Sequence, residues 1–313
     1  MTRIASRAEL ERLLEDDVPY GDLTTEALGI GKVDGVMHFS ARSPMVLALA
    51  EDAAGIIELA GCKVERFAAS GAMLGQGAPI LEARGPAAAL LKSWKIAQTL
   101  IEIWSGVASE TRAIVDAARA AVPGIPIACT RKNVPGTKRF AVAAVKAGGA
   151  VMHRLGLSET VLVFPEHRAF LGGMPLFEVV GRLRKAAPEK KLVVEVTTIE
   201  AAVAAAVAGF DVVQAEKFSP TEIAALVKRM TSMASTRARP AIAAAGGINA
   251  ANASAYAEAG ADVIVTSSPY LAKPKDVQVR VLPVDENAFR ARESSGSRVG
   301  SHIGPICNGQ PAI

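Results

Sequence analysis

The sequence contains few aromatic residues and few cysteines. Two tryptophans and three tyrosines in 313 residues, with a formal net charge of only +4, offer little surface for stacking on bases or for holding a phosphate backbone. Nucleic acid is therefore not an expected partner. The three cysteines, Cys62, Cys129 and Cys307, are far apart and form no pairwise motif, which argues against a disulfide framework and against a zinc site.

Long apolar runs are also missing from the sequence. Residues 1–7 are followed by acidic residues rather than by an apolar stretch, so neither a signal peptide nor a membrane span is expected. We expect a protein of the cytoplasm. Half of the residues are nevertheless hydrophobic, and a chain of this length and composition can bury a large core, most simply in two domains.

Short apolar segments alternate with helical patterns in the second half of the chain. Each of six segments ends in a polar residue or a glycine: residues 125–129, 150–152, 192–194, 211–213, 241–245 and 263–265. This alternation is typical of a parallel β/α array. In such arrays the chemistry gathers at the carboxyl ends of the strands.

The first hundred residues have a mixed α+β pattern. Helical spacing occurs at 9–14 and 46–59, and strand patterns occur at 36–41, 62–67 and 79–83. A long helical stretch begins at Pro86, with Ser105–Gly106 as a candidate interruption before a second helix that ends near Ala121. Two further helix starts have capping-box spacing, Ser219 with Glu222 and Thr197 with Glu200.

The pattern predicts two domains and a tail. We assign residues 1–104 to an α+β domain, which a last strand at 277–284 rejoins, and residues 105–276 to the β/α domain. Residues 287–313 are rich in Ser, Gly, Arg and Asn, which predicts a flexible tail.

Four basic residues follow two successive strands of the array. Arg131 and Lys132 end one strand, and His153 and Arg154 end the next. Such donors suit carboxylate and phosphate oxygens. Each residue alone is more often a solvated surface cation, but four of them at neighbouring strand ends favour a binding site.

Two carboxylates follow the next strands. Glu195 interrupts an apolar run, where an unpaired carboxylate is costly to bury, and Glu216 occupies the matching end of the following strand. Together they could hold Mg²⁺ with waters and substrate oxygens. Ion pairs with neighbouring Lys and Arg residues are an equally good interpretation of the sequence.

Small residues suited to phosphate follow the last two strands. Gly246 and Gly247 join a strand to a helix, where backbone N–H groups can meet a phosphate, although such a pair is often only a tight turn. Ser267 and Ser268 follow the next strand, and successive loops of this kind often share one phosphate site. His167 follows another apolar strand and could approach the same edge, but a lone histidine is more often structural. His38 and His302 have no evident partners.

Several segments, in this order, resemble the quinolinate phosphoribosyltransferase family, also called nicotinate-nucleotide pyrophosphorylase. Within it they most resemble the ModD branch of pyrophosphorylases associated with molybdenum transport. The resemblance extends from about Asp17 to Val284. Its segments are residues 19–25, 105–108, 130–132 with 135–136, 148–156 and 246–248.

The resemblance implies a fold and a reaction. The fold is an N-terminal α+β open sandwich with an incomplete six-stranded α/β barrel, in a homodimer whose active sites face the partner's sandwich. The reaction joins the ring nitrogen of pyridine-2,3-dicarboxylate to phosphoribosyl pyrophosphate, expels pyrophosphate with Mg²⁺ present and removes the 2-carboxylate.

The resemblance also implies roles for the residues at matching positions. Arg131, Lys132, His153 and Arg154 would bind the dicarboxylate and phosphates, and Lys132 would also be catalytic. Glu195 and Glu216 would lie near the ribose and the metal and stabilise a cationic sugar centre. The 5′-phosphate would be held by Gly246, Gly247, Ser267 and Ser268.

Four positions depart from the family's pattern. Lys95 stands where the sandwich domain has an arginine that meets the neighbour's dicarboxylate, and Phe164 stands where a lysine is expected. Glu216 replaces an aspartate and Lys217 an asparagine. Because a cation is lost at Phe164, a doubly charged pyridine acid should bind less well, which leaves the acceptor open.

We therefore expect a phosphoribosyltransferase that uses phosphoribosyl pyrophosphate and Mg²⁺ with a nitrogen heterocycle. A second hypothesis is a noncatalytic protein that binds an oxyanion such as molybdate in the same basic pocket. A third is a lyase or aldolase in which a desolvated Lys132 is the nucleophile.

Overall fold

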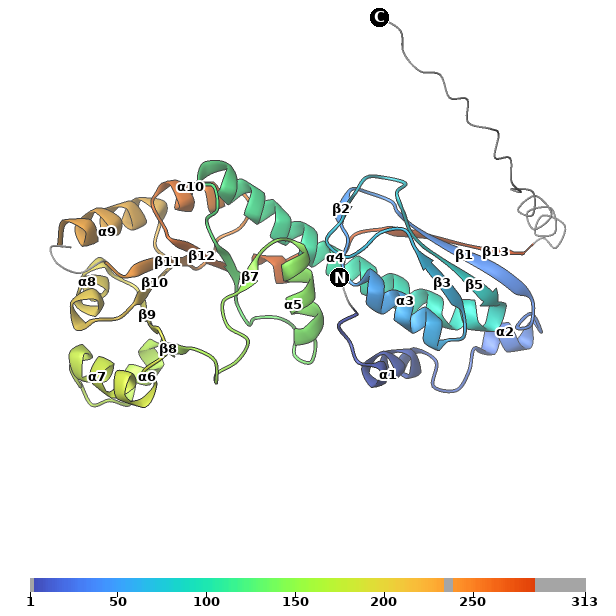
Figure 1. Ribbon diagram of the computed structural model, residues 1–313, viewed down its shortest axis with the longest axis horizontal. Helices are drawn as coiled ribbons and strands as arrows, with labels where there is room; N and C mark the ends of the chain where they lie inside the picture. Colours follow the sequence, from blue (N-terminus) through green and yellow to red (C-terminus); the bar gives the residue numbers. More distant parts are fainter. Residues whose placement is uncertain (1–2, 234–238, 285–313) are drawn as a thin grey trace, which may run out of the picture.

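The computed structural model describes residues 3–233 and 239–284. Figure 1 shows an elongated molecule in which a β/α unit and an α+β unit lie at opposite ends of one long helix, α4 (Ala87–Ala121). The predicted tail at 287–313 and Cys307 lie outside the described residues. No helix in the described ranges is long and apolar enough to cross a membrane.

The β/α unit is built on a curled parallel sheet of seven strands in the order β7-β6-β12-β11-β10-β9-β8. The strands are β6 (Ile127–Cys129), β7 (Val151–Met152), β8 (Val161–Val163), β9 (Leu192–Val196), β10 (Val212–Glu216), β11 (Ala241–Ala245) and β12 (Val263–Thr266). The sequence predicts six strands in this unit and the sheet contains seven. The additional strand is β8, which pairs with β9 at the edge of the sheet. Since β7 and β8 are the two edges, the sheet is a half-barrel and not a closed ring.

Helices follow the strands, as the alternating pattern predicts. They are α5 (Lys138–Ala147), α6 (Pro165–Ala169), α7 (Leu176–Ala186), α8 (Ile199–Ala208), α9 (Pro220–Met233) and α10 (Ala253–Glu258), with a 3-10 turn η1 (Ser268–Leu271). The capping box predicted before α9 is present, because the Glu222 amide donates to Ser219 Oγ at 3.3 Å and the Ser219 amide to Glu222 Oε2 at 2.7 Å. The prediction of a cap at Thr197 is wrong by one residue, since Thr198 Oγ1 accepts from the Ala201 amide at 3.1 Å.

The α+β unit is an antiparallel sheet in the order β13-β1-β5-β3, with helices against it. Its strands are β1 (Asp34–Ala41), β3 (Lys63–Arg66), β5 (Pro79–Pro86) and β13 (Val277–Pro283), and its helices are α1 (Arg7–Asp17), α2 (Leu23–Ala27) and α3 (Ala50–Leu59); β2 (Met45–Val46) and β4 (Met73–Leu74) form a separate pair. β13 returns from the half-barrel and pairs with β1, with Val279 opposite Phe39.

The helix α4 runs without a break through Ser105 and Gly106, so the predicted interruption is wrong. Both residues are buried and serve close packing. Ser105 Oγ accepts from the Ala48 amide at 2.9 Å, and a Cβ atom at Gly106 would overlap the carbonyl oxygen of Lys273. The small residues bring the α+β unit and the chain that leads into β13 against the helix.

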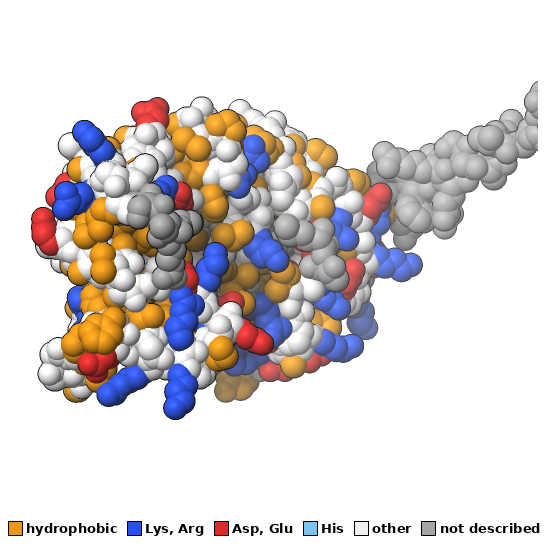
Figure 2. Space-filling view, turned by 60° about the vertical axis from the view of Figure 1, so that its left-hand side comes forward, with side chains coloured by type: hydrophobic (Ala, Val, Ile, Leu, Met, Phe, Trp, Pro, Cys, Tyr) orange, Lys and Arg blue, Asp and Glu red, His pale blue; other side chains and the backbone are white. Residues whose placement is uncertain are grey.

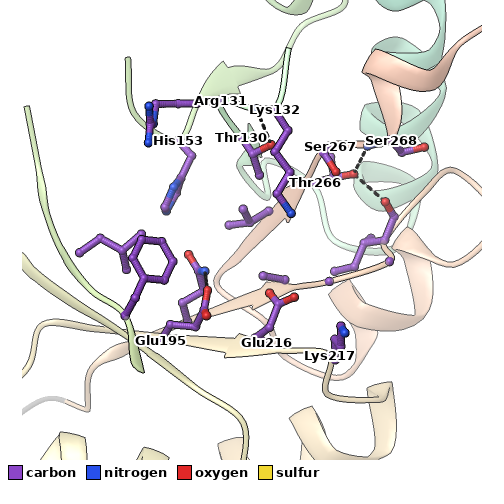
Figure 3. Close-up of a pocket in the computed structure, with 18 of the residues that line it drawn as sticks. Thr130, Arg131, Lys132, His153, Glu195, Glu216, Lys217, Thr266, Ser267 and Ser268 are labelled. Carbon is purple, nitrogen blue, oxygen red and sulfur yellow. Dashed lines mark hydrogen bonds between the residues drawn. The ribbon is translucent and has the colours of Figure 1, made fainter. Parts of the chain in front are cut away.

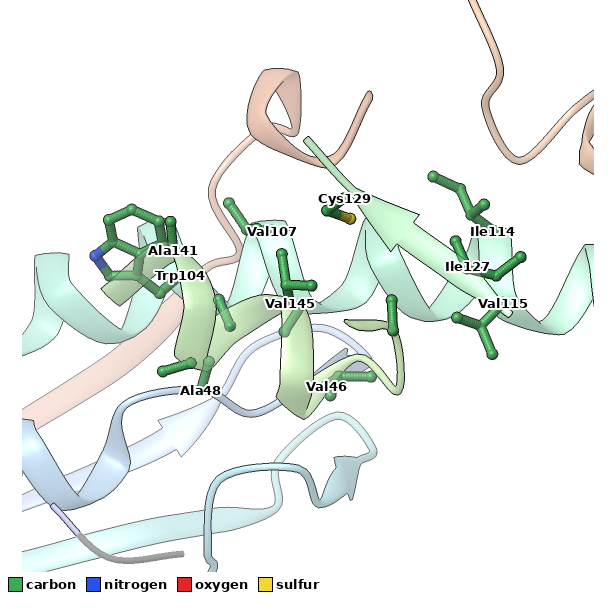
Figure 4. Close-up of a cluster of buried hydrophobic side chains, with 14 of the residues drawn as sticks. Val46, Ala48, Trp104, Val107, Ile114, Val115, Ile127, Cys129, Ala141 and Val145 are labelled. Atoms are coloured by element: carbon green, nitrogen blue, oxygen red, sulfur yellow. The ribbon is translucent and has the colours of Figure 1, made fainter. Parts of the chain in front are cut away.

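Buried side chains on both sides of α4 form one continuous core. Figure 4 shows residues of the α+β unit, of α4, of β6 and of α5 packed together; these include Val46, Ala48, Trp104, Val107, Ile127, Cys129 and Val145. The inner face of the half-barrel is different, because its buried cluster consists of the small side chains Ala128, Ala243, Ala245 and Val265. Small residues there leave space inside the curled sheet.

Candidate active site

That space is a cavity of about 880 Å³ at the carboxyl ends of the strands. Residues that lie in or follow each of the seven strands line it (Figure 3). Figure 2 shows Lys and Arg side chains around a hollow on this side of the molecule. The lining brings together ten of the residues selected from the sequence: Arg131, Lys132, His153, Arg154, Glu195, Glu216, Gly246, Gly247, Ser267 and Ser268.

Arg131 and Lys132 lie in the loop after β6. Thr130 anchors the start of that loop, because its amide donates to the Thr266 carbonyl at 2.9 Å and its carbonyl accepts from the Tyr270 hydroxyl at 2.8 Å. The Lys132 amide donates to Thr130 Oγ1 at 3.3 Å. These bonds hold the backbone of the loop, while both basic side chains line the cavity and are exposed.

His153 and Arg154 follow β7. The His153 amide donates to the Cys129 carbonyl at 2.8 Å, which places the two residues beside the end of β6. Burial, and then the charge of Arg154, lower the pKa of His153. The lowered pKa favours the neutral imidazole at neutral pH, in which His153 can still donate and accept hydrogen bonds. Arg154 is 7 % exposed and its Cζ lies 5.4 Å from the centre of the Phe164 ring. We call Arg131, Lys132, His153 and Arg154 the basic wall.

Glu195 and Glu216 lie in β9 and β10 and form the acidic wall. Gln214 pairs in register with Glu195, and its Nε2 donates to Glu195 Oε2 at 2.7 Å. Burial, followed by the nearby charge of Glu216, raises the pKa of Glu195. In the described part of the chain neither carboxylate has a Lys or Arg partner within ion-pair distance. The ion-pair interpretation of these acids therefore loses its support.

The acidic wall suits one kind of metal ion. No group of three or more His, Cys, Asp and Glu residues in the described ranges could enclose a metal, which excludes a protein-only zinc cage from this part of the chain. Mg²⁺ commonly binds through one or two carboxylates and completes its shell with water and substrate phosphates. Glu195 and Glu216, which repel each other, fit that pattern.

The glycine pair after β11 borders the same cavity. Gly246 has a φ of +93° and Gly247 of +75°, values that glycine adopts without strain. A Cβ atom at Gly246 would lie 2.8 Å from the Lys217 amide nitrogen, so no larger residue fits there. Thr266 joins this turn to the next loop, because its hydroxyl donates to the Ile248 carbonyl at 2.6 Å and accepts from the Ser268 amide at 3.0 Å.

Two family models match the chain over nearly all of this structure. The N-terminal domain of quinolinate phosphoribosyl transferase matches residues 22–105, and the C-terminal domain matches residues 107–280. The chain belongs to the quinolinate phosphoribosyltransferase family. It is a pentosyltransferase-type enzyme, and the predicted family is confirmed.

Relatives within the family agree with this assignment. The ModD protein of Rhodobacter capsulatus, which is named as a pyrophosphorylase, is 48% identical to this chain over 244 residues. The match covers 78% of this chain and 93% of that protein. The nicotinate-nucleotide pyrophosphorylase [carboxylating] of Mycobacterium leprae is 30% identical over 269 residues, 84% of this chain and 92% of that one. The crystal structure of NadC from Streptococcus pyogenes superposes with a TM-score of 0.79 at 25% identity, over 89% of this chain and 96% of that chain.

One residue that the family resemblance selected lies away from the cavity. Lys95 is on α4, where its Nζ lies 4.2 Å from the Trp94 ring centre and 3.3 Å from Gln98 Oε1. It does not line the cavity of its own chain. Its assignment to a neighbour's site stays a prediction.

His167, Gln214 and Lys217 also line this cavity, although none of them was selected from the sequence as a site residue. His167, for which a place near the strand ends was weighed against a structural role, borders the cavity, and its Nδ1 accepts from the Phe164 amide at 3.0 Å. Gln214 is a polar residue inside an apolar strand, and the reasoning applied to Glu195 would have found it. Lys217 has a backbone conformation that no sequence pattern indicated.

Proposed function

We propose that the chain transfers the phosphoribosyl group of phosphoribosyl pyrophosphate to a ring nitrogen of a heterocyclic acid and releases pyrophosphate. One observation supports this most directly. A basic wall and an acidic wall face each other across one cavity that also contains the glycine pair. A ligand with anionic groups and a carbon that becomes positive during the reaction matches all three features.

The chemistry follows from this arrangement. The basic wall binds the carboxylate of the acceptor and phosphate oxygens, and Gly246, Gly247 and Ser267 hold the 5′-phosphate through N–H and O–H donors. The C1–O bond to pyrophosphate breaks, pyrophosphate leaves with the electron pair, and the ring nitrogen forms the new bond to C1. Glu195 and Glu216 stabilise the positive charge that develops on the sugar.

The same two carboxylates would hold Mg²⁺, which when bound neutralises charge on the leaving pyrophosphate. The burial and the charge of Glu216 that raise the pKa of Glu195 support this assignment, because a bound cation offsets both. Gln214 holds Glu195 in place by the hydrogen bond at 2.7 Å.

The acceptor is a heterocycle with fewer negative charges than pyridine-2,3-dicarboxylate. Phe164 places an uncharged ring at the end of β8, next to Arg154, and Leu162 lines the same side. An aromatic acceptor can lie against Phe164 while one carboxylate meets Arg154. The enzyme works as a homodimer, with the partner's Lys95 completing the acceptor site; the position of Lys95 outside its own cavity supports this.

Pyrophosphate release tests the proposal. Purified protein is incubated with phosphoribosyl pyrophosphate, Mg²⁺ and a panel of pyridine and other heterocyclic mono- and dicarboxylic acids. We expect release that depends on one acceptor, with a monoacid favoured over quinolinate. Tight binding of molybdate without pyrophosphate release across the panel would contradict the proposal and favour the oxyanion-binding hypothesis.

The lyase hypothesis is not supported by the position of Lys132. A Schiff-base lysine needs a desolvated environment that keeps its amine neutral, whereas Lys132 is exposed.

A further inference from the structure

Lys217 has an unusual backbone conformation. Its φ is +61°, and in the described ranges only one other residue besides glycine, Leu49, has a positive φ. The left-handed region is unfavourable for a side chain with a Cβ atom, and glycine or asparagine adopts it more easily. Residues held in such conformations are concentrated at functional sites.

The end of β10 imposes this conformation. The Lys217 amide donates to the Ala245 carbonyl at 2.8 Å, directly before the glycine pair. Opposite it, the missing Cβ of Gly246 makes room for Lys217, since such an atom would lie 2.8 Å from the amide nitrogen and 2.9 Å from Cγ. Lys217 and the Gly246–Gly247 turn therefore fit together as one unit.

The Lys217 side chain lines the cavity and is exposed (Figure 3). Its ammonium group has no ion-pair partner among the described residues, although Glu216 is its neighbour in the sequence. Arg131, Lys132 and Arg154 all belong to the opposite, basic wall. Lys217 instead lies beside the acidic wall, next to the Gly246–Gly247 turn that is predicted to bind phosphate.

We propose that Lys217 is a phosphate-binding residue whose ammonium group contacts a phosphate seated on the Gly246–Gly247 turn. A glycine at this position would adopt the backbone conformation without strain but would carry no charge. The lysine accepts the strain and places a cation in the cavity. A point charge with three N–H donors suits a phosphate dianion. The ligand is the 5′-phosphate of the sugar or the pyrophosphate group; the proposed function supplies these two candidates.

The test compares three variants at this position. Lys217→Asn and Lys217→Gly remove the charge and tolerate the backbone conformation, while Lys217→Arg keeps the charge. Lys190→Asn, at an exposed lysine away from the cavity, is the control for net charge. Calorimetry measures the Kd of ribose 5-phosphate and, separately, of inorganic pyrophosphate with Mg²⁺, and thermal unfolding of the unliganded protein measures stability.

We expect Lys217→Asn and Lys217→Gly to weaken binding about tenfold, as for the loss of one charged hydrogen bond. Lys217→Arg and Lys190→Asn should bind within about threefold of the wild type, and Lys217→Gly should melt at or above the wild-type temperature because its backbone is relaxed. Weaker binding of ribose 5-phosphate alone identifies the 5′-phosphate as the partner, and weaker binding of pyrophosphate alone identifies the leaving group.

Two results overturn the inference. One is unchanged binding of both ligands in Lys217→Asn and Lys217→Gly. The other is a wild-type protein that binds neither ligand. Failure of the proposed function has a different signature, namely phosphate binding that depends on Lys217 in a protein that releases no pyrophosphate with any acceptor.

Discussion

The two walls of the cavity are built differently. The cationic side chains of the basic wall follow β6 and β7 in loops, and Arg131 and Lys132 are exposed. The carboxylates of the acidic wall lie within β9 and β10, are partly buried, and Glu195 is held by Gln214 at 2.7 Å. The exposed side chains of Arg131 and Lys132 can move to meet an anion, whereas Glu195 is held by its neighbour in the sheet. The difference indicates capture at the basic wall and charge stabilisation at the acidic wall.

Removing one residue from each wall should have the largest effects. We expect Lys132→Ala and Glu195→Ala each to lower kcat by about 100-fold or more, as for loss of a group that stabilises a transition state. Lys132→Ala should also raise KM for the acceptor, because its wall binds the anion. Steady-state pyrophosphate release measures both. Unchanged turnover in both variants would refute the roles assigned to the walls.

A smaller effect is expected from removing the hydrogen bond that holds Glu195. Gln214→Met keeps the volume but loses the hydrogen bond to Glu195, and we expect kcat to fall about tenfold. Val213→Ala in the same strand is the control, since Val213 is fully buried in the main core and not in the cavity. If the control loses as much activity as Gln214→Met, general damage to β10 and not the position of Glu195 is responsible.

Much of this site could be predicted because polar residues that end apolar strands meet at one edge of a parallel sheet. Ten selected residues line one cavity for that reason. What the sequence could not provide depended on distant contacts. Burial lowers the pKa of His153, and Ser105 and Gly106 stay helical because other segments pack on them. The apolar strand before His167 was noticed but not counted in the array, and its place in the sheet comes from its pairing with β9.

The unliganded acidic wall should also have a pH signature. The pKa of Glu195 in the folded protein is raised above its ordinary 4.5. The protonated form of Glu195 therefore favours the folded state, and this stabilisation is fully present below pH 4.5 and is lost as pH rises through the folded-state pKa. Glu195→Gln removes this loss. We expect the variant's Tm to exceed that of the wild type at pH 7 without metal, and the difference to shrink toward pH 4. A lower Tm for the variant at pH 7 would show that the carboxylate stabilises the unliganded fold.

The smallest effect concerns the support of the basic wall. Tyr270→Phe removes the hydrogen bond to the Thr130 carbonyl at 2.8 Å, and we expect a loss of about 1 kcal/mol in the free energy of unfolding. Denaturant unfolding measures it. Tyr20→Phe, at a residue that is 97% exposed, should change nothing. Equal effects of the two changes would mean that the Tyr270 hydroxyl does not hold the loop.

A crystal structure with phosphoribosyl pyrophosphate and Mg²⁺ bound tests the central claim most directly. The claim is that the two walls and the glycine turn serve a single ligand. We predict one molecule in the cavity, with its 5′-phosphate on Gly246 and Gly247, its ribose beside Glu195 and Glu216, and space for the acceptor against Phe164 and Arg154. A molecule bound in another cavity, or one that leaves the acidic wall without contact, would contradict the account.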